Sequence, residues 1–144
     1  MSIKLLALDL DGTLFGDDLV ISPRIRASIQ AAQKQGVLVT IATGRMFRSA
    51  RHHAEDLNIN APLICYQGAL IRHSVTGETL YHKTVPSDLT HALVTETTER
   101  GLHLNVYVDD RRYVEQINDQ ARFYTQMNMG LEIPEVADMQ CGLP

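Results

Sequence analysis

The sequence predicts an α/β protein that begins with a partial, doubly wound parallel sheet and continues into a smaller domain of mixed strands and helices. Three observations support this class. Short apolar runs alternate with helical patterns in the first half, which is the rhythm of parallel strands joined by crossover helices. These runs are continuous, as in strands covered on both faces. From residue 69 the rhythm changes, so we expect domains at 1–82 and 83–144.

The first strand is expected over residues 3–8, where "IKLLAL" is apolar and leads into acids. A helix follows, with Ser22 as its N-cap, Pro23 at its first position and Gly36 just beyond its end. The run "VLVTIATGR" is rich in β-branched residues and predicts a second strand that ends at residues 43–45. Ligands of parallel sheets bind beyond the carboxyl ends of the strands, so both ends are candidate site positions.

The remaining elements follow from the same local signals of periodicity, caps and turns. In chain order we expect a helix at about 47–57, a third parallel strand at "PLICY", an antiparallel hairpin around Gly77, a helix that stops at Gly101, a half-exposed strand over 102–108 with its turn at "DDRR", and a helix at about 118–128. The tail after this last helix shows little periodicity.

Composition and charge argue against several classes of partner. The net charge is -4 and the arginines are scattered, so no basic stripe favours nucleic-acid binding. Lys4 interrupts the first apolar run, and acids follow it, so it is neither a membrane span nor a signal peptide. Cys65 and Cys141 lie far apart without metal-binding spacing, which favours reduced thiols. We expect a cytoplasmic protein without nucleic-acid or membrane partners.

Two aspartates stand one residue apart where the first strand ends. In an extended chain Asp9 and Asp11 point to the same side, and two such carboxylates repel each other unless a cation or a proton intervenes. A divalent cation that prefers oxygen ligands, above all Mg²⁺, resolves the repulsion and leaves one carboxylate free to attack phosphorus. Gly12 lets the backbone turn sharply, and Thr13 offers a hydroxyl or amide to a phosphate oxygen.

The motifs "DLDGTL" at 9–14 and "TGR" at 43–45, after a hydrophobic strand, resemble those of the haloacid dehalogenase-like phosphohydrolases, in particular their Cof-type branch. The run "ISPRIRASIQAAQKQGVLVTIATGR" and the segment "ICYQGALI" are also similar to that branch. The resemblance implies a Rossmann-like core with an inserted α+β cap. It also implies Mg²⁺-dependent hydrolysis of small phosphorylated metabolites such as sugar phosphates.

The resemblance also implies a role for each motif residue. Asp9 would be the nucleophile that forms an aspartyl-phosphate, and Asp11 would protonate the leaving group and later activate water. The Asp9 carboxylate and the Asp11 backbone carbonyl would bind Mg²⁺. Thr43 would hold the transferring phosphoryl group, Gly44 would allow its close approach, and Arg45 would reach the substrate.

Two parts of the family pattern are not evident. Such enzymes also use a lysine beside the phosphate and a later acidic pair, whereas here the only lysine after the second motif is Lys83 and Asp109–Asp110 fit a hairpin turn. We therefore expect the chain to match only the N-terminal half of such an enzyme and to have weak activity or none alone. The strand at 3–8 would then be an exposed edge, open to self-association or to a complementary chain.

Two alternative functions are also compatible with the sequence. The chain could be a non-catalytic fragment, or half of a split enzyme, that binds Mg²⁺, phosphate or a partner chain. It could also be a phospho-receiver signalling domain. That hypothesis requires a phosphorylated aspartate at the end of the third strand, where the sequence has "ICYQG".

Overall fold

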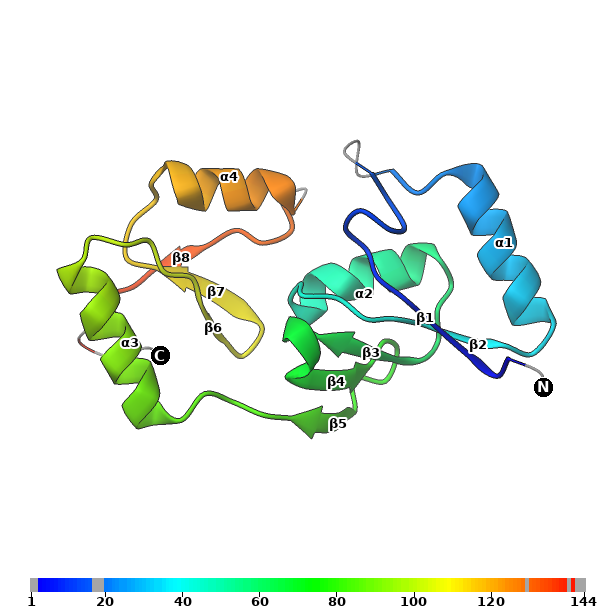
Figure 1. Ribbon diagram of the computed structural model, residues 1–144, viewed down its shortest axis with the longest axis horizontal. Helices are drawn as coiled ribbons and strands as arrows, with labels where there is room; N and C mark the ends of the chain where they lie inside the picture. The colour runs from blue at the N-terminus through cyan, green and yellow to red at the C-terminus, as the bar shows by residue number, and fades with distance from the viewer. Residues whose placement is uncertain (1–2, 17–19, 129, 140, 142–144) are drawn as a thin grey trace. The chain divides into compact units, whose positions relative to one another are not determined.

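The computed structural model describes residues 3–16, 20–128, 130–139 and 141, and the chain divides into two compact units, Met1–Lys83 and Thr84–Pro144 (Figure 1). The first unit contains strands β1 (Leu5–Leu8), β2 (Leu38–Ile41), β3 (Pro62–Cys65), β4 (Leu70–His73) and β5 (Thr79–His82), with helices α1 (Pro23–Lys34) and α2 (Phe47–Asp56). The second unit contains helices α3 (Ser87–Glu99) and α4 (Asp119–Met127), with strands β6 (Val106–Val108), β7 (Arg111–Val114) and β8 (Glu135–Val136). This α/β architecture is the class that the sequence predicts.

The first unit is built on three parallel strands followed by an antiparallel hairpin. β1 and β2 pair in parallel register from Leu5 opposite Leu38 onward. β3 joins β2 through a parallel bridge between Ala42 and Ile64. β4 then pairs antiparallel with β3, and β5 with β4. The carboxyl ends of β1, β2 and β3 therefore meet at one edge of the sheet, as Figure 1 shows.

The residues at its two ends place α1 where the sequence predicts a helix. The Ser22 hydroxyl accepts a hydrogen bond from the Ile25 amide at 3.3 Å, and Pro23 occupies the first turn, where its missing N–H costs nothing. After the helix, Gly36 takes a φ of +78°, which glycine adopts without strain. The predicted start and end of this helix are confirmed.

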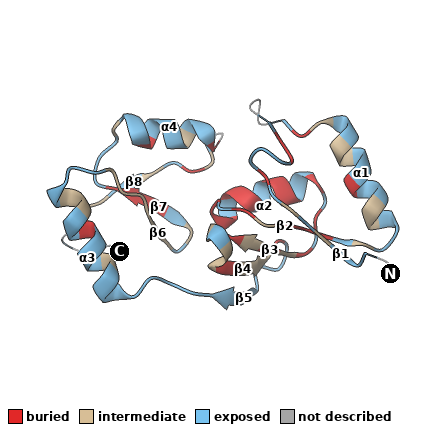
Figure 2. Ribbon diagram, in the orientation of Figure 1, coloured by how far each residue is buried: buried red, intermediate tan, exposed pale blue. Residues whose placement is uncertain are grey.

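The core of the first unit is one apolar cluster shared by the helices and one face of the sheet (Figure 2). Leu6 and Leu8 of β1 pack against it, and Ile41 and Leu63 are fully buried. α1 contributes Ile29, and α2 adds apolar residues from its inner side. This cluster fixes the strand ends that carry the candidate site.

The opposite face of the sheet is open at β1. Leu5 is 55% exposed and its register partner Leu38 is 49% exposed. The sequence predicts burial of this first strand on both faces, and for β1 that prediction is wrong. Within the described residues β1 pairs only with β2, and the helices pack on the side of Leu6 and Leu8.

The second unit has a three-stranded sheet in the order β6–β7–β8. Asp109 and Asp110 join β6 to β7 with φ values of 46° and 63°, the pair of positive values that a two-residue hairpin turn requires, so the predicted "DDRR" turn is confirmed. β8 pairs in parallel with β7 and was not predicted. A two-residue strand is too short to show a period in the sequence.

One arginine lies inside the second unit. Arg112 on β7 is 1% exposed and donates hydrogen bonds at 2.6 Å to both the Thr125 hydroxyl and the Glu132 carbonyl. It therefore joins β7 to α4 and to the segment before β8. Among the described residues, no helix combines the length and apolarity that crossing a lipid bilayer would demand.

Candidate active site

The loop after β1 turns around a single backbone carbonyl. The Leu10 carbonyl oxygen accepts hydrogen bonds from the amides of Thr13, Leu14 and Phe15. Gly12 has a φ of +74°, and its amide donates a hydrogen bond to the Phe15 carbonyl. The apolar residues of this loop are buried. Strand parity therefore sends Leu10 into the core and leaves the aspartates on both sides of it exposed.

The first of these aspartates has a neutral partner. The Thr13 hydroxyl donates a hydrogen bond to Asp9 Oδ2 at 3.2 Å, and both residues are exposed. The sequence predicts that Thr13 binds a phosphate oxygen. The structure shows its hydroxyl on the carboxylate of Asp9, and the contact with phosphate stays a prediction.

The second motif begins directly after β2. Thr43 is buried, its amide donates to the Ile64 carbonyl at 2.9 Å, and its hydroxyl accepts from the Arg45 amide at 3.2 Å. The loop after β3 closes on this motif, because the amides of Tyr66 and Gln67 donate to the carbonyls of Arg45 and Thr43. The three strand ends thus form one connected edge.

Gly44 makes room for a neighbouring side chain. A Cβ atom at position 44 would lie 2.3 Å from Gln67 Nε2, so only glycine accommodates this placement of the glutamine. Gln67 itself takes a φ of 55°. The sequence predicts that Gly44 allows the close approach of a phosphoryl group. In the structure the Gln67 side chain approaches it, and the approach of a phosphoryl group stays a prediction.

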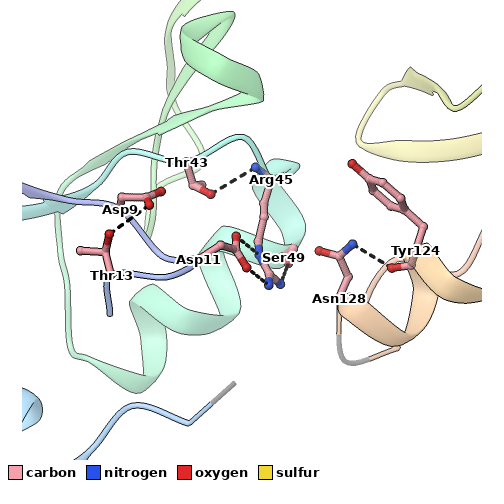
Figure 3. A network of polar contacts seen from close by, with 8 residues as sticks. All are labelled: Asp9, Asp11, Thr13, Thr43, Arg45, Ser49, Tyr124 and Asn128. Atoms are coloured by element: carbon pink, nitrogen blue, oxygen red, sulfur yellow. Dashed lines mark hydrogen bonds and ion pairs between the residues drawn. The ribbon is translucent and has the colours of Figure 1, made fainter. Parts of the chain in front are cut away.

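Asp11 and Arg45 form the strongest polar contact of the site (Figure 3). Arg45 Nη2 donates to Asp11 Oδ1 at 2.6 Å and Arg45 Nε donates to Oδ2 at 2.9 Å, which is the bidentate arrangement of a guanidinium on a carboxylate. Figure 3 shows Arg45 directed at Asp11. The sequence predicts that Arg45 reaches the substrate. The structure shows its guanidinium on the second aspartate, and the contact with substrate stays a prediction.

Two residues that the sequence analysis did not identify hold the Arg45 side chain. The guanidinium carbon lies 5.2 Å from the centre of the Phe15 ring, and Nη1 donates to the Ser49 hydroxyl at 3.4 Å. The spacing of four residues from Arg45 to Ser49 is the only sequence signal for this contact. Arg45 is 8% exposed as a result.

His53 on α2 lies behind the same ring, with the two ring centres 5.2 Å apart. Burial, together with the nearby positive charge of Arg45, lowers the pKa of His53 from 6.5 to about 4. Hydrogen bonds from Arg45 in turn hold the pKa of Asp11 below its usual value. At neutral pH, His53 is therefore uncharged and Asp11 is ionised.

The donor set fits part of a Mg²⁺ site. The exposed Asp9 carboxylate is a hard oxygen ligand, and Mg²⁺ in proteins often takes one or two carboxylates and fills its shell with water and substrate phosphate. The described part of the chain contains no cluster of three or more histidine, cysteine or acidic residues that could hold a metal ion. Asp9 and the backbone after it are the ligands that this edge of the sheet offers.

Comparisons with known proteins point in one direction. The family model described as haloacid dehalogenase-like hydrolase matches residues 6–138. The 5-amino-6-(5-phospho-D-ribitylamino)uracil phosphatase YitU of Bacillus subtilis is 34% identical over 109 residues, which cover 74% of this chain and 40% of that protein. The chain thus spans less than half the length of this relative.

Solved structures agree on the fold. A haloacid dehalogenase-like hydrolase from Bacteroides thetaiotaomicron superposes with a TM-score of 0.87 at 24% identity, over 99% of this chain and 56% of that one. A subclass IIB sugar phosphatase superposes with a TM-score of 0.78 at 22% identity, over 92% and 52% of the two chains. At these identities the two structures are evidence for the fold alone.

Proposed function

This chain belongs to the haloacid dehalogenase-like hydrolases, and from this premise we propose that it carries the nucleophile-bearing part of a Mg²⁺-dependent phosphatase. The supporting observation is the grouping of Asp9, Asp11, Thr43 and Arg45 at the carboxyl edge of β1 and β2, with Asp11 and Arg45 in direct contact. Ligands of parallel α/β sheets bind at this edge.

In the proposed reaction Asp9 attacks the phosphorus of a phosphomonoester and the bond from phosphorus to the ester oxygen breaks. Asp11, which is ionised while Arg45 holds it, first takes up a proton from the entering phosphate ester and then gives that proton to the leaving oxygen, which departs as an alcohol. In the second half, water attacks the aspartyl-phosphate while Asp11 takes a proton from it, so that Asp9 and inorganic phosphate are restored. Thr43 and Thr13 would bind phosphoryl oxygens during both steps. Gly44 would leave room for these oxygens once the Gln67 amide, which lies against Gly44 in the structure, moves aside.

Mg²⁺ would be held by the Asp9 carboxylate and the Asp11 backbone carbonyl, and when bound it would neutralise negative charge on the phosphoryl group. The carboxylate of Asp11 is engaged by Arg45, so the proposal assigns the backbone carbonyl of Asp11 to the ion and not its side chain. This division lets the side chain of Asp11 serve in proton transfer while its backbone serves the ion.

We propose small phosphorylated metabolites, such as sugar phosphates, as substrates. The relative YitU is named for a phosphoribityl compound, and one structural neighbour is named a sugar phosphatase. Both cysteines are free thiols, which supports a reducing compartment such as the cytoplasm. A panel of phosphate esters tested with Mg²⁺ would define the substrate.

Trapping with beryllofluoride tests the nucleophile. This phosphoryl mimic should bind the Mg²⁺-loaded chain and give a bound ¹⁹F NMR signal that the Asp9→Asn variant lacks. Asp110→Asn, in the hairpin turn of the second unit, is the matched control and should keep the signal. A signal that survives in Asp9→Asn would contradict the assignment.

The same experiment separates the phosphatase from a phospho-receiver. A receiver would bind the mimic at an aspartate after the third parallel strand, yet β3 ends at Cys65 and is followed by Tyr66, Gln67 and Gly68. Mapping the modified residue to any aspartate other than Asp9 would favour the receiver. Absence of a bound signal in the wild-type chain would instead favour a non-catalytic fragment.

We also propose that the open edge of β1 receives a further strand, from a second copy or from a complementary chain that completes the sheet. Leu5 and Leu38 lie exposed beside that edge, and unpaired strand edges with apolar neighbours readily pair with other chains. Leu5→Lys should reduce self-association measured by analytical ultracentrifugation, whereas Leu80→Lys on β5, at the other end of the sheet, should not. Equal effects of the two variants would argue against a role for this edge.

If the chain is half of a split enzyme, a complementary half that supplies the lysine and the later acids should raise its turnover of phosphate esters. The chain alone should show weak turnover or none. Robust Mg²⁺-dependent turnover by the isolated chain would show that no such complement is needed.

A further inference from the structure

The two members of the Asp11–Arg45 pair are held very differently. The Arg45 side chain is 6% exposed and is fixed by the Phe15 ring on one side and the Ser49 hydroxyl on another. The Asp11 side chain is 48% exposed and stands next to Gly12, whose φ is +74°. If the pair opens, Asp11 therefore moves while the guanidinium stays in place.

The surface that Arg45 offers to Asp11 also suits a phosphate group. Nε and Nη2 both donate to the two carboxylate oxygens, and this planar fork matches two oxygens of a phosphate equally well. The fork lies beyond the carboxyl ends of β1 and β2, close in sequence to Thr43. A phosphate that enters the site therefore competes with Asp11 for the same two donors.

We propose that Arg45 is a positioning residue that holds Asp11 until a substrate phosphate displaces the carboxylate from the guanidinium and so releases Asp11 toward the leaving group. This inference deepens the proposed function and rests on it for the class of substrate. The exchange replaces one pair of hydrogen bonds with another, and no covalent bond is made or broken. Asp11 becomes available only when a phosphate is present.

Arginine side-chain ¹⁵N NMR of the metal-free chain, titrated with inorganic phosphate, follows this exchange. The Nε–H resonance of Arg45 should disappear or shift in Asp11→Asn, which assigns it, and should move saturably with phosphate in the wild type. Arg51 is the internal control, because its Nε donates to Glu55 at 2.9 Å, the same length as the bond from Arg45 Nε to Asp11. The Arg51 resonance should stay constant.

Competition predicts the direction of the affinity change. Because Asp11 occupies the fork, Asp11→Asn should bind phosphate about tenfold more tightly than the wild type, the effect of losing a charged hydrogen-bonded competitor. Asp9→Asn removes the same charge nearby but frees no donor of Arg45, so it should tighten binding much less. If Asp11→Asn does not fold, the phosphate titration of the wild-type chain alone tests the proposal.

An Arg45 resonance that phosphate leaves unmoved in the wild type would overturn the proposal. Equal tightening by Asp9→Asn and Asp11→Asn would also overturn it, since that result is a general charge effect. The beryllofluoride experiment reports on Asp9 and this titration reports on Arg45, so the proposed nucleophile and the exchange can fail independently.

Discussion

Replacing Arg112 with methionine should unfold the second unit and leave the first unit folded. The side chain is 1% exposed and makes two hydrogen bonds of 2.6 Å, to the Thr125 hydroxyl and the Glu132 carbonyl. Hydrogen bonds from a charged donor contribute about 1.5–3 kcal/mol each, so Arg112→Met should cost about 3–6 kcal/mol. A unit of about 60 residues has a total stability of about 3–9 kcal/mol. The expected loss is therefore comparable to the whole stability of the unit.

Hydrogen exchange measured by mass spectrometry locates this effect. Peptides that cover β7 and α4 should lose protection in Arg112→Met, whereas peptides that cover β2 and β3 should keep it, because the two sets lie in different compact units.

The neighbouring arginine provides a matched control. Arg111 points to the opposite side of β7, is exposed, and forms an ion pair with Glu135 at 3.3 Å. Exposed pairs of this kind contribute about 0–1 kcal/mol, so Arg111→Met should leave protection of the second unit almost unchanged. Native-like protection of β7 and α4 in Arg112→Met would refute the reasoning, as would equal losses in the two variants.

Three further predictions concern the first unit and can be checked by urea unfolding. Ser22→Ala removes the side-chain cap of α1 and should cost about 1 kcal/mol. The pKa of His53 is about 4 in the folded chain instead of 6.5, so the unfolded chain takes up a proton at this residue first as the pH falls. The free energy of unfolding should therefore decrease by up to about 3 kcal/mol from pH 6.5 to 4. His53→Leu should abolish that decrease, and His52→Leu, on the exposed side of α2, should not. Gly44→Ala should cost about 1 kcal/mol, and less in a Gln67→Ala background, where the contacting amide is gone.

The sequence predicts those elements whose ends are determined by neighbouring residues. Ser22 and Pro23 define the start of α1 without help from the rest of the chain. The hairpin turn at Asp109–Asp110 is likewise a local choice, since both residues tolerate a positive φ. The parallel arrangement of the first three strands follows from the alternation of strands and helices, because crossover connections leave few alternatives.

What the sequence does not predict depends on contacts between distant segments. Leu5 is as apolar as Leu6, and only the placement of the helices decides that one is exposed and the other packed. Arg112 sits in an ordinary turn-and-strand pattern beside Arg111, yet its acceptors come from α4 and from the segment before β8. No local period carries that information.

In the candidate site too, local pattern predicts the positions of residues, whereas contacts between distant segments decide their partners. The period of two in β1 predicts that Asp9 and Asp11 point to the same side, and the parallel pairing of β1 with β2 brings Thr43 to the same edge. The partner of Arg45 could not be predicted, because it depends on where Phe15 and Ser49 come to lie. A short sequence motif thus predicts the position of a residue better than it predicts its contacts.

The contacts also support the choice of Asp9 over Asp11 as the nucleophile of the proposed reaction. Within the described part of the chain, the Asp9 carboxylate accepts a hydrogen bond from the neutral Thr13 hydroxyl at 3.2 Å, whereas both oxygens of Asp11 accept from a guanidinium at 2.6 and 2.9 Å. A guanidinium withdraws electron density from the oxygens it contacts and must be left before they attack, at a cost typical of charged hydrogen bonds. Among the residues that the structure describes, Asp9 has no guanidinium partner to leave, because its contact is a neutral hydroxyl. In the proposed reaction Arg45 would therefore distinguish two chemically identical side chains, leaving Asp9 to attack and retaining Asp11 for proton transfer.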